Sequence, residues 1–275
     1  MSSPHGSPPP SNSVLTACKS FVRNTPLVTR YAVAWIFLSY VLPYVWDYQS
    51  DIENSPLFTL LHIELYRIIL APFVCTDIVS LLFGSYSLYT SGKRLERAIG
   101  SIAFLTILPT VGCLTNILHL TLYVSVCLIT GNHIWLHARS YDTWTIVLGI
   151  IAMECSKAPS GYTRQFIFPN VPMFYYPVAL LAFFCLIRKS IVPASAYFFS
   201  VLVGYAFGLD KLTFLQPSAN RCSSWENNIP SAFTQDPGWI NVNAASGSSA
   251  WEILPTDQVK SIILIFQNYP FFSFE

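Results

Sequence analysis

Apolar segments follow one another along residues 25–209, with only short polar stretches between them. About 20 apolar residues in a helix cross the roughly 30 Å hydrocarbon layer of a bilayer. Hydrophobic residues make up 53% of the chain and charged residues 11%, whereas an average soluble domain has roughly 25% charged residues. Because so little charge cannot cover the surface of a soluble globule, the sequence predicts an integral membrane protein.

The composition excludes several other classes of protein. A net charge of +1 provides no basic field for nucleic acid. The chain also has 20 Phe, 15 Tyr and 7 Trp, which is too many for a disordered protein. Its seven Cys show no Cys-x-x-Cys spacing, so neither a zinc site nor a disulfide framework is predicted. We expect no cofactor.

Composition divides the chain into three parts. Residues 1–24 begin with a Ser/Pro-rich stretch and predict a disordered tail. Residues 25–209 predict an all-α polytopic membrane domain with six transmembrane helices. Residues 210–275, rich in Asn, Ser and Pro, predict a largely disordered cytosolic tail. The expected spans are 25–46, 76–92, 101–129, 143–155, 175–187 and 195–209.

The ends of these spans carry further signals. Thr25-Pro26 combines a capping residue with proline at the first helical position. Residues 47–67 interleave leucines with acidic side chains, which predicts an amphipathic segment at the membrane surface. Lys and Arg before the first span, after the second and after the fourth place both termini in the cytosol, although Arg188 and Lys189 break this rule.

The stretch ELYRIILAPF…LLFGSYSLYTSGKRLERAIGS resembles the rhomboid family. Tyr66-Arg67 stands where rhomboids usually have Trp-Arg. The Leu-Glu-Arg turn that follows the second span of rhomboids is nearly complete, with Gly92, Leu95, Glu96, Arg97, Gly100 and Ser101. A basic cytosolic loop that matches by chance is the alternative interpretation. The resemblance implies a six-helix rhomboid-like bundle.

Small residues recur every four positions along the sixth span, at Ala196, Ser200, Gly204 and Gly208. Such a stripe lets two helix backbones approach closely in lipid. Gly149 and Ala152 in the short fourth span could form the facing surface. Rhomboids pack a short fourth helix against a Gly-rich sixth in a similar way, but many membrane bundles have a small-residue interface.

Within rhomboids, residues 60–215 are most similar to the eukaryotic branch with a C-terminal ubiquitin-associated domain. The similarity lies in FIFPNVPMFYYP, VGYAFGL and FLQPS. In the tail, TDQVKSIILIF could begin one helix of such a domain, but we do not expect a complete module.

Rhomboid proteases pair a serine on the fourth helix with a histidine on the sixth. Their pattern places Trp144, or its neighbour Thr143 or Thr145, at the serine and Tyr197 at the histidine. No histidine follows residue 137, and a tyrosine with a pKa of ~10 is a poor base. We therefore expect a rhomboid-like pseudoprotease without a catalytic dyad, although family transfer alone would suggest a serine-type endopeptidase.

Other polar residues in the spans have structural interpretations. Asn116 and His119 either line a polar cavity or, as we favour, form interhelical hydrogen bonds. Glu154 with Lys157 predicts an interfacial pair at a helix end, and Asp77 predicts a helix cap. His133 and His137 have the i, i+4 spacing that suits a metal, but no third ligand is near in sequence, so no metal site is predicted.

The resemblance implies a non-catalytic protein that binds transmembrane clients in quality control or trafficking, in the endoplasmic reticulum or Golgi. The implied partners are client proteins, ubiquitin-dependent degradation machinery and the bilayer, with no nucleic acid. An active rhomboid intramembrane serine endopeptidase with a displaced dyad is one alternative. A small carrier or channel is another, but it predicts repeated halves around midplane charges, and no internal repeat is evident.

Overall fold

Helices dominate the computed structural model, which describes residues 24–46, 48–158, 161–165, 170–188 and 191–245. Over these ranges one hairpin of two short strands, β1 and β2, accompanies the helices. The predicted all-α fold class is therefore confirmed. The elements are α2 (Leu27–Val41), α3 (Gln49–Ile52), α4 (Tyr66–Leu70), α5 (Ser85–Ile99), α6 (Ser101–Thr130), α7 (Trp144–Lys157), β1 (Thr163–Gln165), β2 (Asn170–Pro172), α8 (Tyr176–Arg188), α9 (Ile191–Gly208), α10 (Ala219–Glu226) and α11 (Ser231–Thr234).

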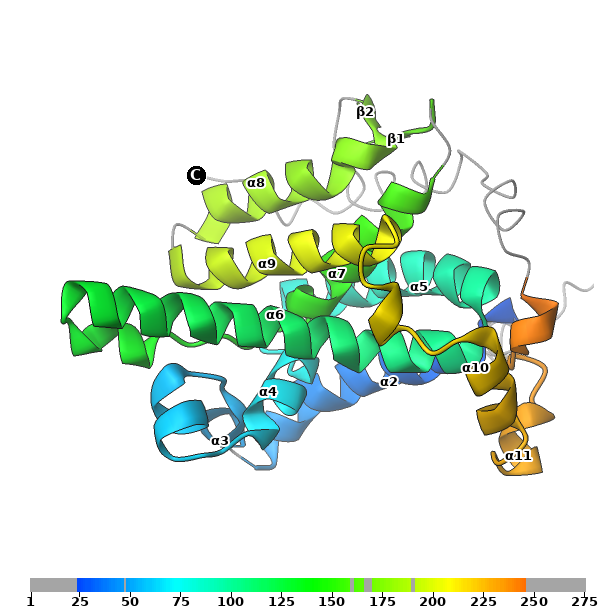
Figure 1. Ribbon diagram of the computed structural model, residues 1–275, viewed down its shortest axis with the longest axis horizontal. Helices are drawn as coiled ribbons and strands as arrows, with labels where there is room; N and C mark the ends of the chain where they lie inside the picture. Colours follow the sequence, from blue (N-terminus) through cyan, green and yellow to red (C-terminus); the bar gives the residue numbers. More distant parts are fainter. Residues whose placement is uncertain (1–23, 47, 159–160, 166–169, 189–190, 246–275) are drawn as a thin grey trace, which may run out of the picture.

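Helix α7 forms the centre of the bundle. Every residue from Trp144 to Cys155 is buried, and α7 packs against α5, α6, α8 and α9. In Figure 1 the long helix α6 runs beside α9, with α8 on the outer side of α9 and α2 on the opposite side of α6. The apolar sequence of α7 thus becomes the protein core, and it is not a lipid-facing surface.

Helix α5 extends beyond its predicted end at residue 92, because it continues to Ile99. The Leu-Glu-Arg residues therefore lie in the last turns of a helix, and the prediction that they form a turn after it is wrong. The break comes at Gly100, whose φ of +91° is rarely adopted by residues with a side chain. Gly92 is a contact residue within the helix: a Cβ there would lie 3.1 Å from Thr29 Oγ1.

Two described segments, Leu27–Tyr44 and Ser101–Thr130, are long and apolar enough to cross a membrane. A third span is counted if Val192–Gly208 and Thr213–Glu226, which meet at 88°, form one broken span. Helices α7 and α8 are shorter, with 14 and 13 residues. Six spans thus stay a prediction, whereas six helices do lie near the expected positions.

Part of the C-terminal tail is folded, which its Asn/Ser/Pro-rich composition did not predict. The backbone N–H of Leu27 at the start of α2 donates to Gly238 O (2.8 Å), and that of Ser101 at the start of α6 donates to Ile240 O (2.9 Å). Arg30 pairs with Asp236 at 3.1 Å. The hydrogen bonds that Arg30 and the backbone N–H of Gly238 donate to the Asp236 carboxyl lower its pKa. Short polar segments become ordered here because helix ends offer unpaired N–H groups.

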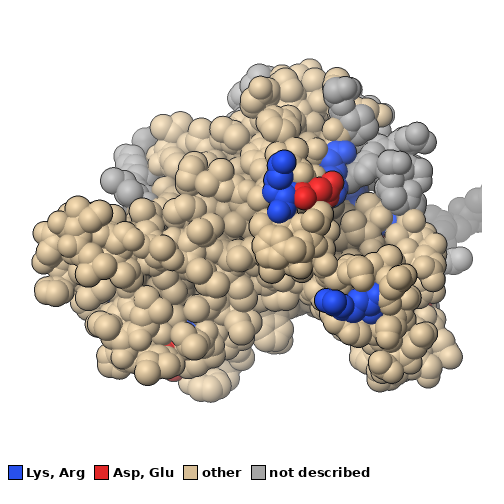
Figure 2. Space-filling model, in the orientation of Figure 1, with Lys and Arg blue, Asp and Glu red and all other residues tan. Residues whose placement is uncertain are grey.

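The expected domain boundary falls where α9 ends, at Gly208. It stays a prediction, and the expectations for residues 1–23 and 246–275 lie outside the described residues. The starts of α2 and α6 and the segment 236–240 meet at one end of the bundle. Figure 2 shows a face with few charged side chains, and most of these lie on the right-hand half of the view.

Candidate functional site

The two positions expected to hold a catalytic pair lie around one aromatic ring. Trp144 begins α7 and Tyr197 lies on α9, and only 3% and 1% of their surfaces are exposed. The ring centroid of Phe184 on α8 lies 4.4 Å from the ring centroid of Trp144 and 5.8 Å from that of Tyr197. Aromatic side chains from three helices therefore fill the place where the resemblance puts a dyad.

A buried carboxylate, that of Asp142, also holds this site together. Its Oδ2 accepts a hydrogen bond from the hydroxyl of Tyr197 (2.9 Å), and its Oδ1 accepts one from the backbone N–H of Trp144 (3.4 Å). Asp142 is fully buried. Sequence reasoning missed this residue, although an Asp just before an apolar helix is a helix-start signal.

The side chains at these two positions are an indole and a phenol, and their contacts position the surrounding helices. A serine hydrolase needs a hydroxyl nucleophile hydrogen-bonded to a base. Trp144 has no hydroxyl, and Tyr197 donates its own proton to a carboxylate. The contacts fix α7 against α9 and α8.

A different serine and histidine do meet, between α6 and α9. Ser195 Oγ lies 3.2 Å from His119 Nδ1 and 3.2 Å from the hydroxyl of Tyr123. The same Oγ donates to the carbonyl of Val192 (2.7 Å), one turn back in its own helix. Sequence reasoning sought a histidine after the serine and so missed one that precedes it by 76 residues.

Asn116, which lies one turn before His119 on α6, makes hydrogen bonds to neighbouring segments, as we favoured. Its Nδ2 donates to Ile68 O (2.9 Å), and its Oδ1 accepts from Ser140 Oγ (3.2 Å). Asp77 caps the helical segment that follows it, because its Oδ1 accepts from the N–H of Ser80 at 2.7 Å.

The Tyr66-Arg67 motif organises the segment between α2 and α5. Arg67 is nearly buried, and its Nη1 donates to the carbonyls of Ser50 (2.8 Å) and Glu53 (3.0 Å). Its guanidinium also lies 5.0 Å from the ring of Phe58. Arg67 thus holds α3 and the residue that follows it against the start of α4. An arginine suits this position because its guanidinium offers several N–H donors in one plane.

Glu96 of the Leu-Glu-Arg motif binds the start of α2. Its buried carboxylate accepts from the backbone N–H groups of Val28 (3.0 Å) and Thr29 (2.8 Å) and from the hydroxyls of Thr29 (2.8 Å) and Ser101 (2.6 Å). Neighbouring Leu95 is fully buried, and Arg97 donates to Asn24 O (3.1 Å). The motif is therefore a helix cap supplied by another helix.

The stripe of small residues lies between α7 and α9. A Cβ on Gly204 would lie 2.2 Å from Gly149 O and 2.8 Å from Ala152 Cβ, and one on Gly208 would lie 2.9 Å from Met153 O. Ser200 Oγ donates to Thr145 O across the same contact, and Ala196 is buried. The two backbones touch along this line, as the sequence predicts for a stripe of this kind.

The predicted pair of Glu154 and Lys157 is wrong. Glu154 is fully buried and pairs with Arg94 on α5 and with Arg164 on β1 (3.6 Å), while Lys157 pairs with Asp210 (3.0 Å). Both arginines reach Glu154 because α5 and β1 run past the end of α7. Long-range neutralisation of a buried charge thus replaces the local pair.

We predict that Glu154→Ala destabilises the protein by about 2–3 kcal/mol. This is less than the roughly 3–5 kcal/mol for breaking a fully buried pair, because the two arginines left without a partner are 25% and 14% exposed. Asp210→Ala is the matched control, since it also removes the carboxylate of an ion pair but at a site that is 63% exposed; it should cost less than about 1 kcal/mol. Thermal unfolding in detergent, followed by tryptophan fluorescence, measures both. Equal melting temperatures for the two variants would contradict the prediction.

Among the described residues, no three His, Cys, Asp or Glu side chains gather in a way that could hold a metal ion. His133 and His137 lie on a 3₁₀ turn after α6.

Comparisons with known proteins agree with this architecture. The family model described as "Eukaryotic integral membrane protein (DUF1751)" matches residues 30–234. The chain is also similar to Rhomboid-like protein 15 of Arabidopsis thaliana, with 24% identity over 234 residues that cover 82% of this chain. The match spans 57% of the length of that relative.

Proposed function

Because the chain belongs to the DUF1751 family of eukaryotic integral membrane proteins and is rhomboid-like, we propose that it binds transmembrane clients without catalysis. Its clients would be membrane proteins in secretory-pathway quality control or trafficking. The compartment proposed is the endoplasmic reticulum or Golgi, with both termini cytosolic. Ubiquitin-dependent degradation machinery is the partner class that the resemblance suggests.

The observation that carries this proposal is the filled site around Phe184. Trp144 and Tyr197 occupy the expected dyad positions, and their rings pack against one phenylalanine while Asp142 accepts the tyrosine hydroxyl. Trp144 has no hydroxyl to act as a nucleophile, and the hydroxyl of Tyr197 donates a hydrogen bond to Asp142. A rhomboid-like bundle of this kind can still recognise helices.

Helix α8 supports a role in client binding. Its 13 residues span about 20 Å at 1.5 Å per residue, less than the roughly 30 Å hydrocarbon layer. It packs against α7 and α9, and Leu186 near its end is 76% exposed. A short helix on the outside of the bundle favours a locally thinned bilayer. In a thinned bilayer, moving a client helix with a polar residue from lipid to the protein costs less free energy.

The arrangement of charge supports the proposed orientation. Lys93, Arg94 and Arg97 lie near the end of α5, and Lys157 ends α7. The starts of α2 and α6 and the segment 236–240 meet at the same end. A concentration of Lys and Arg marks the cytosolic side of a membrane protein.

Photo-crosslinking tests client binding. Benzoylphenylalanine at Val178 or Leu186 of α8 should give adducts in microsomes with a co-expressed one-span client whose helix carries a central Asn. The same probe at Ile129, which is 84% exposed near the end of α6, is the control and should give few adducts. Equal yields at all three positions, or none, would refute the proposal.

The alternative of a displaced dyad rests on the contact between Ser195 and His119. If Ser195 is a nucleophile, a fluorophosphonate probe should label the purified protein, and Ser195→Ala should abolish the label. We expect no label above that of Ser195→Ala, because the hydroxyl donates to Val192 O in its own helix. Specific labelling together with cleavage of a transmembrane substrate would overturn the non-catalytic proposal.

A further inference from the structure

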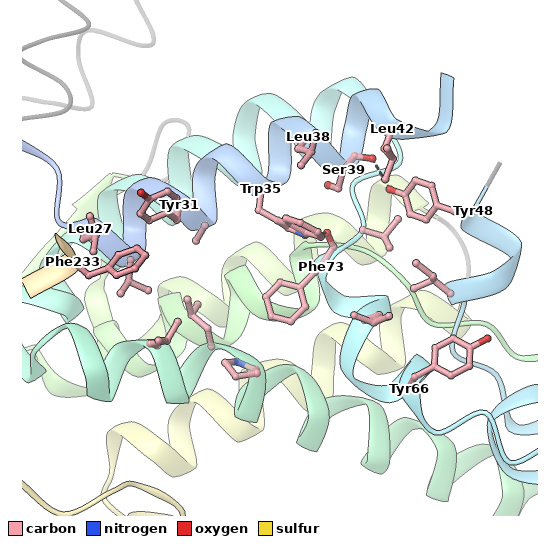
Figure 3. Close-up of a pocket in the computed structure, with 18 of the residues that line it drawn as sticks. Leu27, Tyr31, Trp35, Leu38, Ser39, Leu42, Tyr48, Tyr66, Phe73 and Phe233 are labelled. Atoms are coloured by element: carbon pink, nitrogen blue, oxygen red, sulfur yellow. Dashed lines mark hydrogen bonds between the residues drawn. The ribbon is translucent and has the colours of Figure 1, made fainter. Parts of the chain in front are cut away.

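An apolar groove runs along α2 on the side that faces α6 and α4. It encloses about 860 Å³, and in Figure 3 its lining side chains extend from Phe233 at one end to Tyr48 and Tyr66 at the other. The walls come from α2, residues 42–46 and 48–74, α6 and residues 229–239. Nothing in the bundle of α7, α8 and α9 contributes to this lining, so the groove is separate from the site around Phe184.

Two polar side chains along the groove, Trp35 and Tyr48, are bonded within the protein. Trp35 Nε1 donates to Phe73 O (3.2 Å), and the hydroxyl of Tyr48 donates to Ser39 O (2.6 Å). Among the other lining residues, Asp51 has an exposed carboxylate beside Tyr66 at one end of the groove, and the rest are almost all hydrocarbon or aromatic. A ligand held along the middle of such a groove must itself be apolar.

The volume decides which apolar ligand fits. A helix about 10–12 Å wide that crosses a layer of roughly 30 Å occupies at least ~2,400 Å³. This is nearly three times the volume of the groove, so the groove cannot enclose a whole transmembrane helix. A flexible hydrocarbon chain is much thinner and fits lengthwise.

The position of the groove points to the bilayer as the source of that chain. Tyr31, Trp35 and Leu38 line it and are also exposed on the outer surface of α2, within the segment that is long and apolar enough to cross a membrane. The groove therefore opens sideways to lipid. Tyr48 and Tyr66 at one end are the aromatic residues typical of a membrane interface.

We propose that the groove binds an acyl chain of a bilayer glycerophospholipid, and that residues 229–239 close one end of it. Phe233 and Trp239 belong to that closing segment and line the groove. The Arg30–Asp236 pair and the hydrogen bond from Leu27 N to Gly238 O hold the segment in place. This proposal does not depend on client binding.

The test uses the full chain in phosphatidylcholine vesicles that contain a phosphatidylcholine with a diazirine near the end of one acyl chain. After illumination we expect lipid adducts on Leu108 and Val28, which line the groove but are only 4% and 6% exposed. Adducts on Ile117, a lipid-facing residue of α6, report labelling by bulk lipid. Labelling of Ile117 without Leu108 and Val28 would overturn the proposal.

Two variants fill the groove from opposite walls. Ala32→Trp on α2 and Leu105→Trp on α6 should each reduce labelling of Leu108 several-fold and leave Ile117 unchanged. Leu105 is half-exposed, so its variant should fold even if Ala32→Trp does not. Ala34→Trp is the matched control, because Ala34 lies on α2 but outside the lining, and it should leave both signals unchanged. Equal labelling of Leu108 in all three variants would overturn the proposal.

A benzoylphenylalanine at Leu105 reads out the competing occupants. Adducts with phospholipid support the proposal. Adducts with residues 246–275 of the same chain, or with a second protein, in place of lipid would overturn it.

Discussion

Gly204→Ala should destabilise the bundle by about 3 kcal/mol, at the upper end of the usual cost of overpacking. The new Cβ would lie 2.2 Å from Gly149 O and 2.8 Å from Ala152 Cβ. A backbone oxygen inside a helix cannot rotate away, so α7 and α9 must move apart. That movement also loosens the contacts of Trp144 and Tyr197 with Phe184.

Gly84→Ala is the matched control for this prediction. A Cβ on Gly84 would meet no atom within 4 Å, and alanine is favoured over glycine in a helix by roughly 0.5–1 kcal/mol. We therefore expect Gly84→Ala to melt at or slightly above the wild-type temperature, and Gly204→Ala well below it. Indistinguishable melting curves in detergent would show that α7 and α9 do not touch as described.

Glu96→Ala is the second change with a large expected effect. It leaves the N–H groups of Val28 and Thr29 and the hydroxyls of Thr29 and Ser101 without their acceptor. A buried polar group that loses its partner costs about 1–3 kcal/mol, so we expect a total loss of more than about 3 kcal/mol. Amide hydrogen exchange should accelerate first at the start of α2.

Glu96→Gln keeps the size of the side chain and one acceptor oxygen, but its amide group adds donors that face other donors. Its stability should therefore lie between those of wild type and Glu96→Ala. Wild-type exchange rates at Val28 and Thr29 in Glu96→Ala would contradict the assignment of Glu96 as the cap of α2.

The sequence predicted α6 well because a long apolar stretch with a glycine at each end marks its two limits. The expected span was 101–129 and the helix is Ser101–Thr130, with Gly100 and Gly131 at positive φ on either side. The end of α5 was missed because Gly92 looked like a breaker. Its lack of a side chain instead lets Thr29 and Phe104 approach the helix, which no local pattern reveals.

The site could be predicted only in part for the same reason. A family pattern placed Trp144 and Tyr197, which do lie around one ring. Asp142 and Tyr197 are 55 residues apart in the sequence. Neither hydropathy nor local residue spacing can predict a hydrogen bond between residues so far apart in the chain. For Glu154 the sequence predicted the wrong partner. Lys157 is close in sequence and was chosen, whereas Arg94, which pairs with Glu154 in the structure, is 60 residues away.

The hydrogen bond from Leu27 to Gly238 joins residues that a ribosome makes far apart in time. At about 5–20 residues per second, the start of α2 waits roughly 10–40 s for Gly238 to emerge. During that interval Glu96 is the first acceptor to reach this helix end. The fold therefore closes in the order of translation, first with the cap from α5 and last with the C-terminal segment. A chain that stops before residue 238 has the cap from Glu96 but lacks the acceptor for the N–H of Leu27.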